Sequence, residues 1–202
     1  MHRSARLTLG LLAVLESTVA QSTVGFGPYF SLGPTQSWIR EANTTLVLPE
    51  TPTPDLLDRL ALWPGMGTSA GDLIQALALG GEQVPASPGD GLTMHYVYND
   101  DTGEYEQTVS INGQVVSSLS TSSGQAEGWG TAVECQDDAC QSTAPAHQYL
   151  STTIILDSAD QSFGDTLAIN EADSSGLTTS DDGKTWTVST ININSHTFAS
   201  KV

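Results

Sequence analysis

The chain has 202 residues, with 6 Lys or Arg against 23 Asp or Glu, and a formal net charge of -17 at pH 7. This balance argues against binding to nucleic acids or to anionic membranes, because both require clustered basic side chains. Only 14% of the residues are charged and 38% are hydrophobic, so the chain is also unlike an acidic disordered tail. Its length fits one folded domain with a substantial core.

Residues 1–20 have the pattern of a secretory signal peptide. Arg3 and Arg6 give a basic start, an apolar run covers 7–15, and Ala20 is a small residue at the expected cleavage point. The apolar run is too short to span a bilayer, and a buried N-terminal helix is the alternative. The pattern predicts a secreted, extracellular protein with a single domain over residues 21–202.

Two local signals follow in the first third of the mature chain. Asn43 begins an Asn-Thr-Thr sequon, which predicts a surface position and a glycoprotein. Residues 54–62, with Asp55 at a capping position, predict one short helix or a loop.

Beyond residue 90 the dominant hydrophobic period is two, which is typical of strands. Strands are predicted at 92–98, 105–111, 114–119, 130–135, 149–156, 166–169 and 185–193. The dipeptide Asn112-Gly113 is the strongest hairpin signal in the chain. Many short strands separated by turns indicate an all-β fold, an antiparallel β-sandwich, rather than a fold of alternating strands and helices.

The two cysteines of the chain, Cys135 and Cys140, flank a polar turn sequence. In an exported protein such a pair is expected to form a disulfide. A metal site is the weaker interpretation, since two thiols without a neighbouring His are too few ligands.

An ordered set of short motifs spans about residues 39–156. In chain order they are 62–67 (LWPGMG), 73–76 (LIQA), 87–90 (SPGD), the turns at 102–103 and 112–113, 132–134 (AVE), the cysteine pair and Pro145. This set resembles the eqolisins, the fungal glutamic peptidases. The resemblance implies a concanavalin-like jelly-roll sandwich with a substrate cleft on one face.

The resemblance also implies a catalytic pair, Glu134 and Gln75. A carboxylate such as Glu134 can take a proton from water and return it to the leaving amine. The Gln75 amide can donate a hydrogen bond to the developing oxyanion. The competing interpretation makes Glu134 a solvated carboxylate at a strand end and Gln75 an ordinary polar residue.

The histidines offer no rival arrangement. His95, His147 and His196 lie on separate predicted strands or loops, and no Gly-x-Ser-x-Gly motif accompanies them. A Ser–His–Asp mechanism is therefore not indicated.

The chain departs from the eqolisins at two places. In that family a strand rich in Trp and Tyr follows the catalytic Gln, whereas residues 76–83 contain no aromatic residue here. Eqolisins also carry a basic pro-segment, but residues 21–38 contain no Lys or Arg.

Two other function classes therefore remain open. One is a non-catalytic carbohydrate-binding module, with Trp63, Trp129 and Tyr96 as a stacking surface, unless these aromatics are core. The other is a small-molecule enzyme, such as a cyclase or isomerase of fungal secondary metabolism, on the same scaffold. The leading interpretation is an acid-active glutamic endopeptidase or a degenerate relative.

The expected partners follow from these interpretations. The expected substrate is a polypeptide or a small molecule that contacts Trp63, Trp129 and Tyr96. The protein is expected to be a monomer. No metal, nucleotide or phosphate motif occurs in the sequence, so no cofactor is expected.

Overall fold

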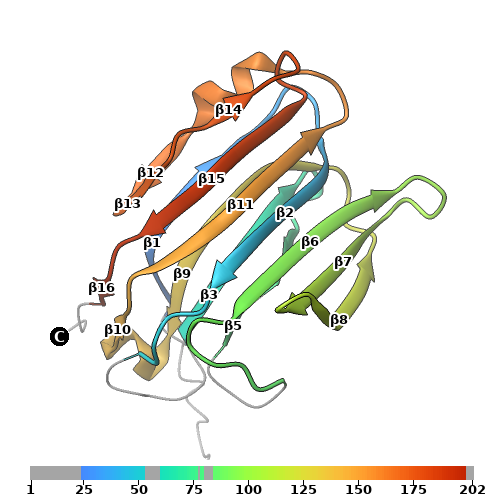
Figure 1. The fold of residues 1–202 in the computed structure, drawn as a ribbon. Helices are drawn as coiled ribbons and strands as arrows, with labels where there is room; N and C mark the ends of the chain where they lie inside the picture. Colours follow the sequence, from blue (N-terminus) through green and yellow to red (C-terminus); the bar gives the residue numbers. More distant parts are fainter. Residues whose placement is uncertain (1–23, 53–59, 77, 80–83, 199–202) are drawn as a thin grey trace, which may run out of the picture.

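The computed structural model describes residues 24–52, 60–76, 78–79 and 84–198, and its strands form two facing antiparallel layers (Figure 1). The first layer has the order β12-β1-β9-β3, and the short strands β4 and β5 pair with β3. The strands of this layer are β1 (Val24–Leu32), β3 (Leu60–Thr68), β4 (Leu73–Gln75), β5 (Ala78–Leu79), β9 (Ala126–Gln136) and β12 (Ala168–Asn170).

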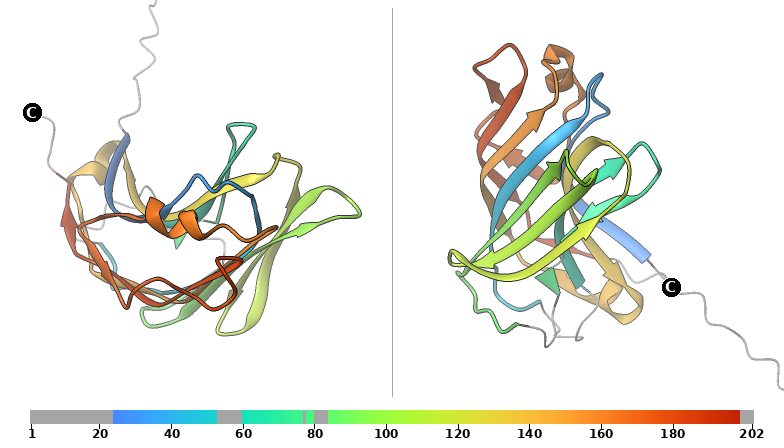
Figure 2. Two further views of the ribbon diagram at one scale, coloured as in Figure 1. Left: turned by 90° about the horizontal axis from the view of Figure 1, so that it is seen from above. Right: turned by 90° about the vertical axis from the view of Figure 1, so that its right-hand side faces the viewer.

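The second layer has the order β8-β7-β6-β2-β11-β15, and both β13 and β14 pair with β15. Its strands are β2 (Ile39–Val47), β6 (Gly91–Asn99), β7 (Glu104–Ile111), β8 (Gln114–Thr121), β11 (His147–Leu156), β13 (Ala172–Ser174), β14 (Thr178–Thr179) and β15 (Thr185–Ile193). Figure 2 shows β6, β7 and β8, in green, at one edge of the molecule. The strands β10 (Thr143–Ala144) and β16 (His196–Thr197) form a separate pair. The structure confirms the expected antiparallel β-sandwich.

The core lies between the layers, and alternation along β9 shows which side chains enter it. Trp129, Val133 and Cys135 are at most 2% exposed, whereas Ala132 and Glu134 between them are only partly buried. The second layer contributes the inward side chains of its own alternating strands. These include Ala42, Leu46, Met94, Tyr96, Tyr149, Ile154 and Ile191.

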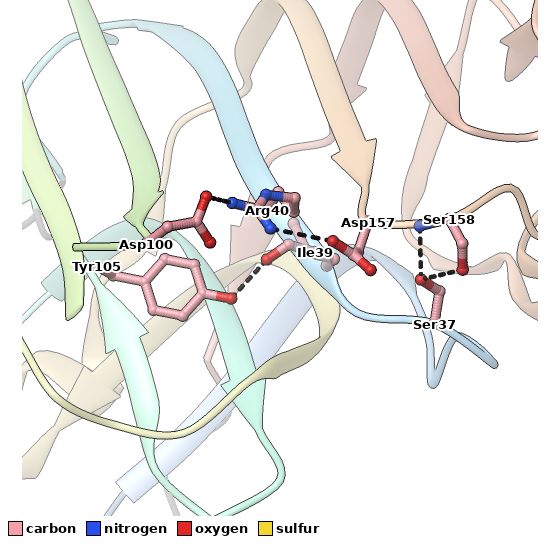
Figure 3. Close-up of polar contacts among 7 residues, drawn as sticks. All are labelled: Ser37, Ile39, Arg40, Asp100, Tyr105, Asp157 and Ser158. Carbon is pink, nitrogen blue, oxygen red and sulfur yellow. Dashed lines mark hydrogen bonds and ion pairs between the residues drawn. The ribbon is translucent and has the colours of Figure 1, made fainter. Parts of the chain in front are cut away.

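The layers are joined where Ile39 of β2 pairs with Ala126 of β9. The buried hydroxyl of Tyr105 donates to the Ile39 carbonyl (Figure 3). It also accepts from the Ala126 amide, so one side chain bonds to both sides of the junction. Burial raises the pKa of Tyr105 to about 12, because the phenolate would lose its hydration there.

Arg40 ties three segments together beside this junction (Figure 3). Its guanidinium pairs with Asp100 after β6 and, at 3.0 Å, with Asp157 after β11. The same group lies 4.8 Å from the Trp38 ring centroid and 5.6 Å from that of Tyr98. These contacts hold the ends of the strands together.

Most of the predicted strands are present, with differences at their ends. The strand predicted at 185–193 matches β15, and the predicted hairpin turn has Asn112 at φ 49° and Gly113 at φ 86°. The strand predicted at 166–169 begins later, because residues 161–166 form a 3₁₀ turn, η2 (Gln161–Thr166), capped by Asp160.

Two predictions near the N-terminus fall partly or wholly outside the described residues. The signal peptide at 1–20 is one of them. Of the predicted helix or loop at 54–62, residues 54–59 are likewise outside, and Leu60 already begins β3. No helix in the described part of the chain is long and apolar enough to cross a membrane.

The predicted disulfide between Cys135 and Cys140 is confirmed, with the two Cα atoms 5.1 Å apart. The intervening residues form a 3₁₀ segment, η1 (Asp137–Gln141), rather than a simple hairpin turn. The bond fixes the end of β9 directly after Glu134.

Candidate active site

Glu134 lies on the outer face of the first layer, turned away from the core. It comes between Val133 and Cys135, which are 1% and 0% exposed, so the alternation of β9 directs it outward. Its neighbours across the sheet are Phe26 of β1 and Ala61 of β3.

Gln75 reaches the same face from the other side of β3. The β3–β4 hairpin turns through Gly71 at φ 85° and places Gln75 opposite Gly65. Ile74 is 3% exposed and belongs to the core, which fixes the phase of this short strand. Because Ala61, opposite Glu134, and Gly65 lie an even number of residues apart on β3, Gln75 and Glu134 share a face.

The indole of Trp63 lies between these two side chains. Its Nε1 donates to Glu134 Oε2 at 3.2 Å. A Cβ built on Gly65 would lie 3.2 Å from Trp63 Cζ3 and 3.1 Å from Gln75 Cβ. The ring thus extends from the carboxylate to the backbone opposite Gln75, and Gly65 leaves room for both side chains.

The side chains of Glu134 and Gln75 differ in how completely they are hydrogen-bonded. Glu134 Oε1 accepts from Gln136 Nε2 at 3.2 Å, so each carboxylate oxygen has one donor. Gln75 Oε1 is buried and accepts no hydrogen bond from the described residues. A buried carbonyl without a donor is costly, and a bound ligand can supply one.

Two of the predicted substrate contacts are in the core instead. Tyr96 is 1% exposed, and its hydroxyl donates to the Pro64 carbonyl at 2.8 Å and accepts from the Ala76 amide at 2.9 Å. Trp129 is 2% exposed and packs edge-to-face on Phe30. Strand alternation identified both as face residues, but sequence alone did not show that their face is the inner one.

Tyr96 still matters for the site, although it cannot stack on a ligand. It reaches across the sandwich from β6 and holds the backbone on either side of the β3–β4 hairpin. Burial raises its pKa, so the hydroxyl remains a neutral donor. We regard Tyr96 as a positioning residue for Gln75.

Sequence reasoning missed two exposed aromatics on this face, Phe26 and Tyr29 of β1. They are 66% and 38% exposed and lie opposite Glu134 and Ala132. The only signal in the sequence was two aromatic residues three positions apart, and the β-bulge between them hides the alternation.

The histidines are dispersed, as predicted. His95 pairs with Glu41 at 2.8 Å, His196 pairs with Glu171 at 2.7 Å, and His147 is bonded to the Pro145 carbonyl. Across the described ranges no three His, Cys, Asp or Glu side chains form a group that could hold a metal ion.

Comparison with known proteins gives a structural likeness only. No protein-family model and no curated protein matches the chain. Two similar crystal structures are of Scytalido-glutamic peptidase, one with a peptide-based transition-state analogue and one with a transition-state analogue inhibitor. Both are 17% identical, with TM-scores of 0.47 and 0.48, and cover 84% of this chain and 99% of the other.

A likeness at this identity and TM-score carries no argument for an activity. The function proposed below therefore rests on the residues of this chain.

Proposed function

We propose that this chain is an exported glutamic peptidase of eqolisin type, which hydrolyses polypeptides at acid pH. The observation that carries the proposal is the placement of Glu134 and Gln75 on one outer face, on either side of Trp63. A carboxylate and an amide so placed can supply the general base and the oxyanion donor for amide hydrolysis by activated water.

The chemistry follows from these positions. Glu134 takes a proton from a water molecule, whose oxygen attacks the peptide carbonyl carbon. Gln75 Nε2 donates to the oxygen that gains negative charge, and Glu134 then returns the proton to the leaving amine. Trp63 and Gln136 orient the carboxylate through their hydrogen bonds.

Export is part of the same proposal. The signal-peptide pattern at 1–20 and the Cys135–Cys140 disulfide both suit an oxidising, extracellular setting.

Asn43 lies in β2 between His95 and Thr153, half-buried on the second layer, and we propose that it carries a glycan. Mass analysis before and after enzymatic deglycosylation checks this modification. A monomer without nucleic-acid or membrane partners suits the acidic composition.

A binding role without hydrolysis has one observation in its favour. The Trp63 indole already donates to Glu134 and fills space between the carboxylate and Gln75. If the ring stays there, no water can be activated in contact with both groups. The scaffold would then hold a small molecule or a sugar against its exposed aromatics.

Digestion of an unfolded protein substrate between pH 2 and pH 6 separates the two functions. We expect the wild type to cleave it and Glu134→Gln to be inactive, since an amide cannot accept the proton. Glu104→Gln, which alters a carboxylate on β7 of the other layer, is the matched control and should cleave normally. A wild type that cleaves nothing in this range, or an active Glu134→Gln, refutes the peptidase proposal.

A further inference from the structure

The most exposed aromatic side chain among the described large hydrophobics is Phe26, at 66%. Tyr29, three residues later on the same strand, is 38% exposed. Exposed aromatics that adjoin a candidate catalytic carboxylate are a usual feature of ligand sites, where they supply contact area at low entropic cost.

A β-bulge puts both rings on the face of Glu134. Residues three apart on a regular strand point to opposite faces. Here the register with β9 shifts between Phe26 and Tyr29, so that Phe26 lies opposite Glu134 and Tyr29 opposite Ala132. The additional residue in β1 therefore restores a common direction for the two rings.

Small residues separate this aromatic strand from Trp63. Ala132 of β9 lies between Tyr29 on one side and Trp63 on the other, and Gly130 is the next residue of β9 on this face. With adjacent strands about 4.8 Å apart, the backbones of Tyr29 and Trp63 are about 10 Å apart. A Cβ on Gly130 would lie 3.0 Å from Ser31 Cβ, so packing keeps this position bare.

We propose that Phe26, Tyr29, Trp63 and Ala132 form a subsite for one large apolar side chain, Phe, Tyr or Leu, of a polypeptide substrate. The inference rests on the proposed function and adds the substrate class. The aromatic wall that is missing after Gln75 is supplied from β1 instead. The occupant is the substrate residue next to the peptide bond that is cleaved, because Phe26 and Trp63 both adjoin the Glu134 carboxylate.

Charge disfavours an acidic occupant, and the aromatic lining favours an apolar one. Among the residues that pair with Ala132 or lie next to it on this face, Glu134 is the only carboxylate. The described strands β1, β3, β4 and β9 contain no Lys or Arg. An acidic side chain would be repelled by Glu134 and by the net negative charge of the protein. The aromatic rings, with the small Ala132 between them, favour contact with an apolar side chain.

The test measures binding of capped hexapeptides that differ only in one central residue, Phe or Ala, at pH 4. The protein is full-length mature Glu134→Gln, which binds without turnover, alone and combined with Tyr29→Ala or Phe26→Ala. We expect the Phe peptide to bind at least about tenfold more tightly than the Ala peptide, and Tyr29→Ala to remove most of that preference.

Val115→Ala is the matched control, since Val115 is 63% exposed on β8 of the other layer. Tyr29→Ala, Phe26→Ala and Val115→Ala all remove exposed side chains, so unchanged circular dichroism and Tm confirm that the variants fold. The proposal is overturned if Phe and Ala peptides bind equally, or if Tyr29→Ala and Val115→Ala leave the same preference.

Cleavage assays distinguish this inference from the proposed function. If the wild type cleaves no peptide but prefers Phe in binding, the subsite stands and the peptidase proposal fails. If the wild type cleaves Phe and Ala peptides with equal kcat/KM, the peptidase stands and the subsite is refuted.

Discussion

At the scale of single residues, Gln75 and Trp63 decide what Glu134 can do. Gln75 Oε1 is buried without a donor in the described chain, and Trp63 Nε1 is bonded to the carboxylate. A buried carbonyl oxygen without a donor, close to a carboxylate, favours a ligand that brings a hydrogen-bond donor.

Replacing Gln75 with Ala tests its proposed role. Loss of one oxyanion donor is expected to lower kcat by roughly two to three orders of magnitude. Since Ile74 rather than Gln75 fills the core, the fold should be retained, as judged by Tm. A variant that keeps wild-type kcat on a Phe-containing peptide would show that Gln75 does not contact the reacting carbonyl.

Asp160 has a buried carboxylate that accepts several hydrogen bonds. It is 8% exposed and accepts from Thr35 Oγ1, the Gln36 amide, and both the amide and hydroxyl of Ser162. Burial alone would raise the pKa of Asp160, but these hydrogen bonds outweigh it and lower the pKa.

Asp160→Asn should therefore destabilise the fold in a pH-dependent way. An amide can accept only part of this donor set, so we expect a loss of about 1–3 kcal/mol at pH 6. A carboxyl whose pKa is lowered by folding gives stability above its unfolded pKa and loses it as pH falls through the folded value. Urea unfolding at pH 6 and pH 3 should show the difference from wild type shrinking at pH 3; an unchanged difference would contradict this.

At the scale of strands, alternation predicted much of the site and register supplied the rest. Val133 as a core residue and Glu134 as an outward one follow from period two, and the structure agrees. Alternation could not say which face of β6 is inner, so Tyr96 was misplaced. It also could not reveal Phe26 and Tyr29, because a bulge breaks the period between them.

β11 begins with a histidine that the sequence did not show to be buried. His147 is 6% exposed, its Nδ1 is bonded to the Pro145 carbonyl, and its Nε2 has no partner in the described chain. Burial lowers the pKa of His147, because the charged ring would lose its hydration.

His147→Phe should gain stability relative to wild type as the solution is acidified. A histidine whose pKa is lowered by folding binds protons more readily when unfolded, so wild-type stability falls as pH drops below about 6.5. Phe has no such dependence. The Tm of His147→Phe minus the Tm of the wild type should be larger at pH 5 than at pH 7.5. A constant difference would show that His147 does not titrate on unfolding.

At the scale of the whole molecule, carboxylates greatly outnumber cations. In the described ranges the only Lys and Arg side chains are Arg40 and Lys184, and Arg40 already pairs with Asp100 and Asp157. Most of the remaining acidic side chains therefore repel one another at neutral pH, and unfolding relieves that repulsion.

The protein should therefore be more stable in mild acid than at alkaline pH. We expect a higher Tm at pH 4–5 than at pH 8, with this collective repulsion exceeding the opposite effect of His147. Added NaCl should raise Tm at pH 8 more than at pH 4.5, because salt screens the repulsion. A Tm that climbs steadily toward pH 8 would contradict the account.

The central claim is that Glu134 and Gln75 act on one substrate carbonyl, and a double-mutant cycle tests it most directly. The measurement is kcat/KM at acid pH for wild type, Glu134→Asp, which keeps a displaced carboxylate and a measurable rate, Gln75→Ala and the double variant. Groups that serve one transition state are strongly non-additive, so the double variant should be no slower than the slower single variant. Losses that multiply across the two variants would show that the residues act independently and would contradict the shared site.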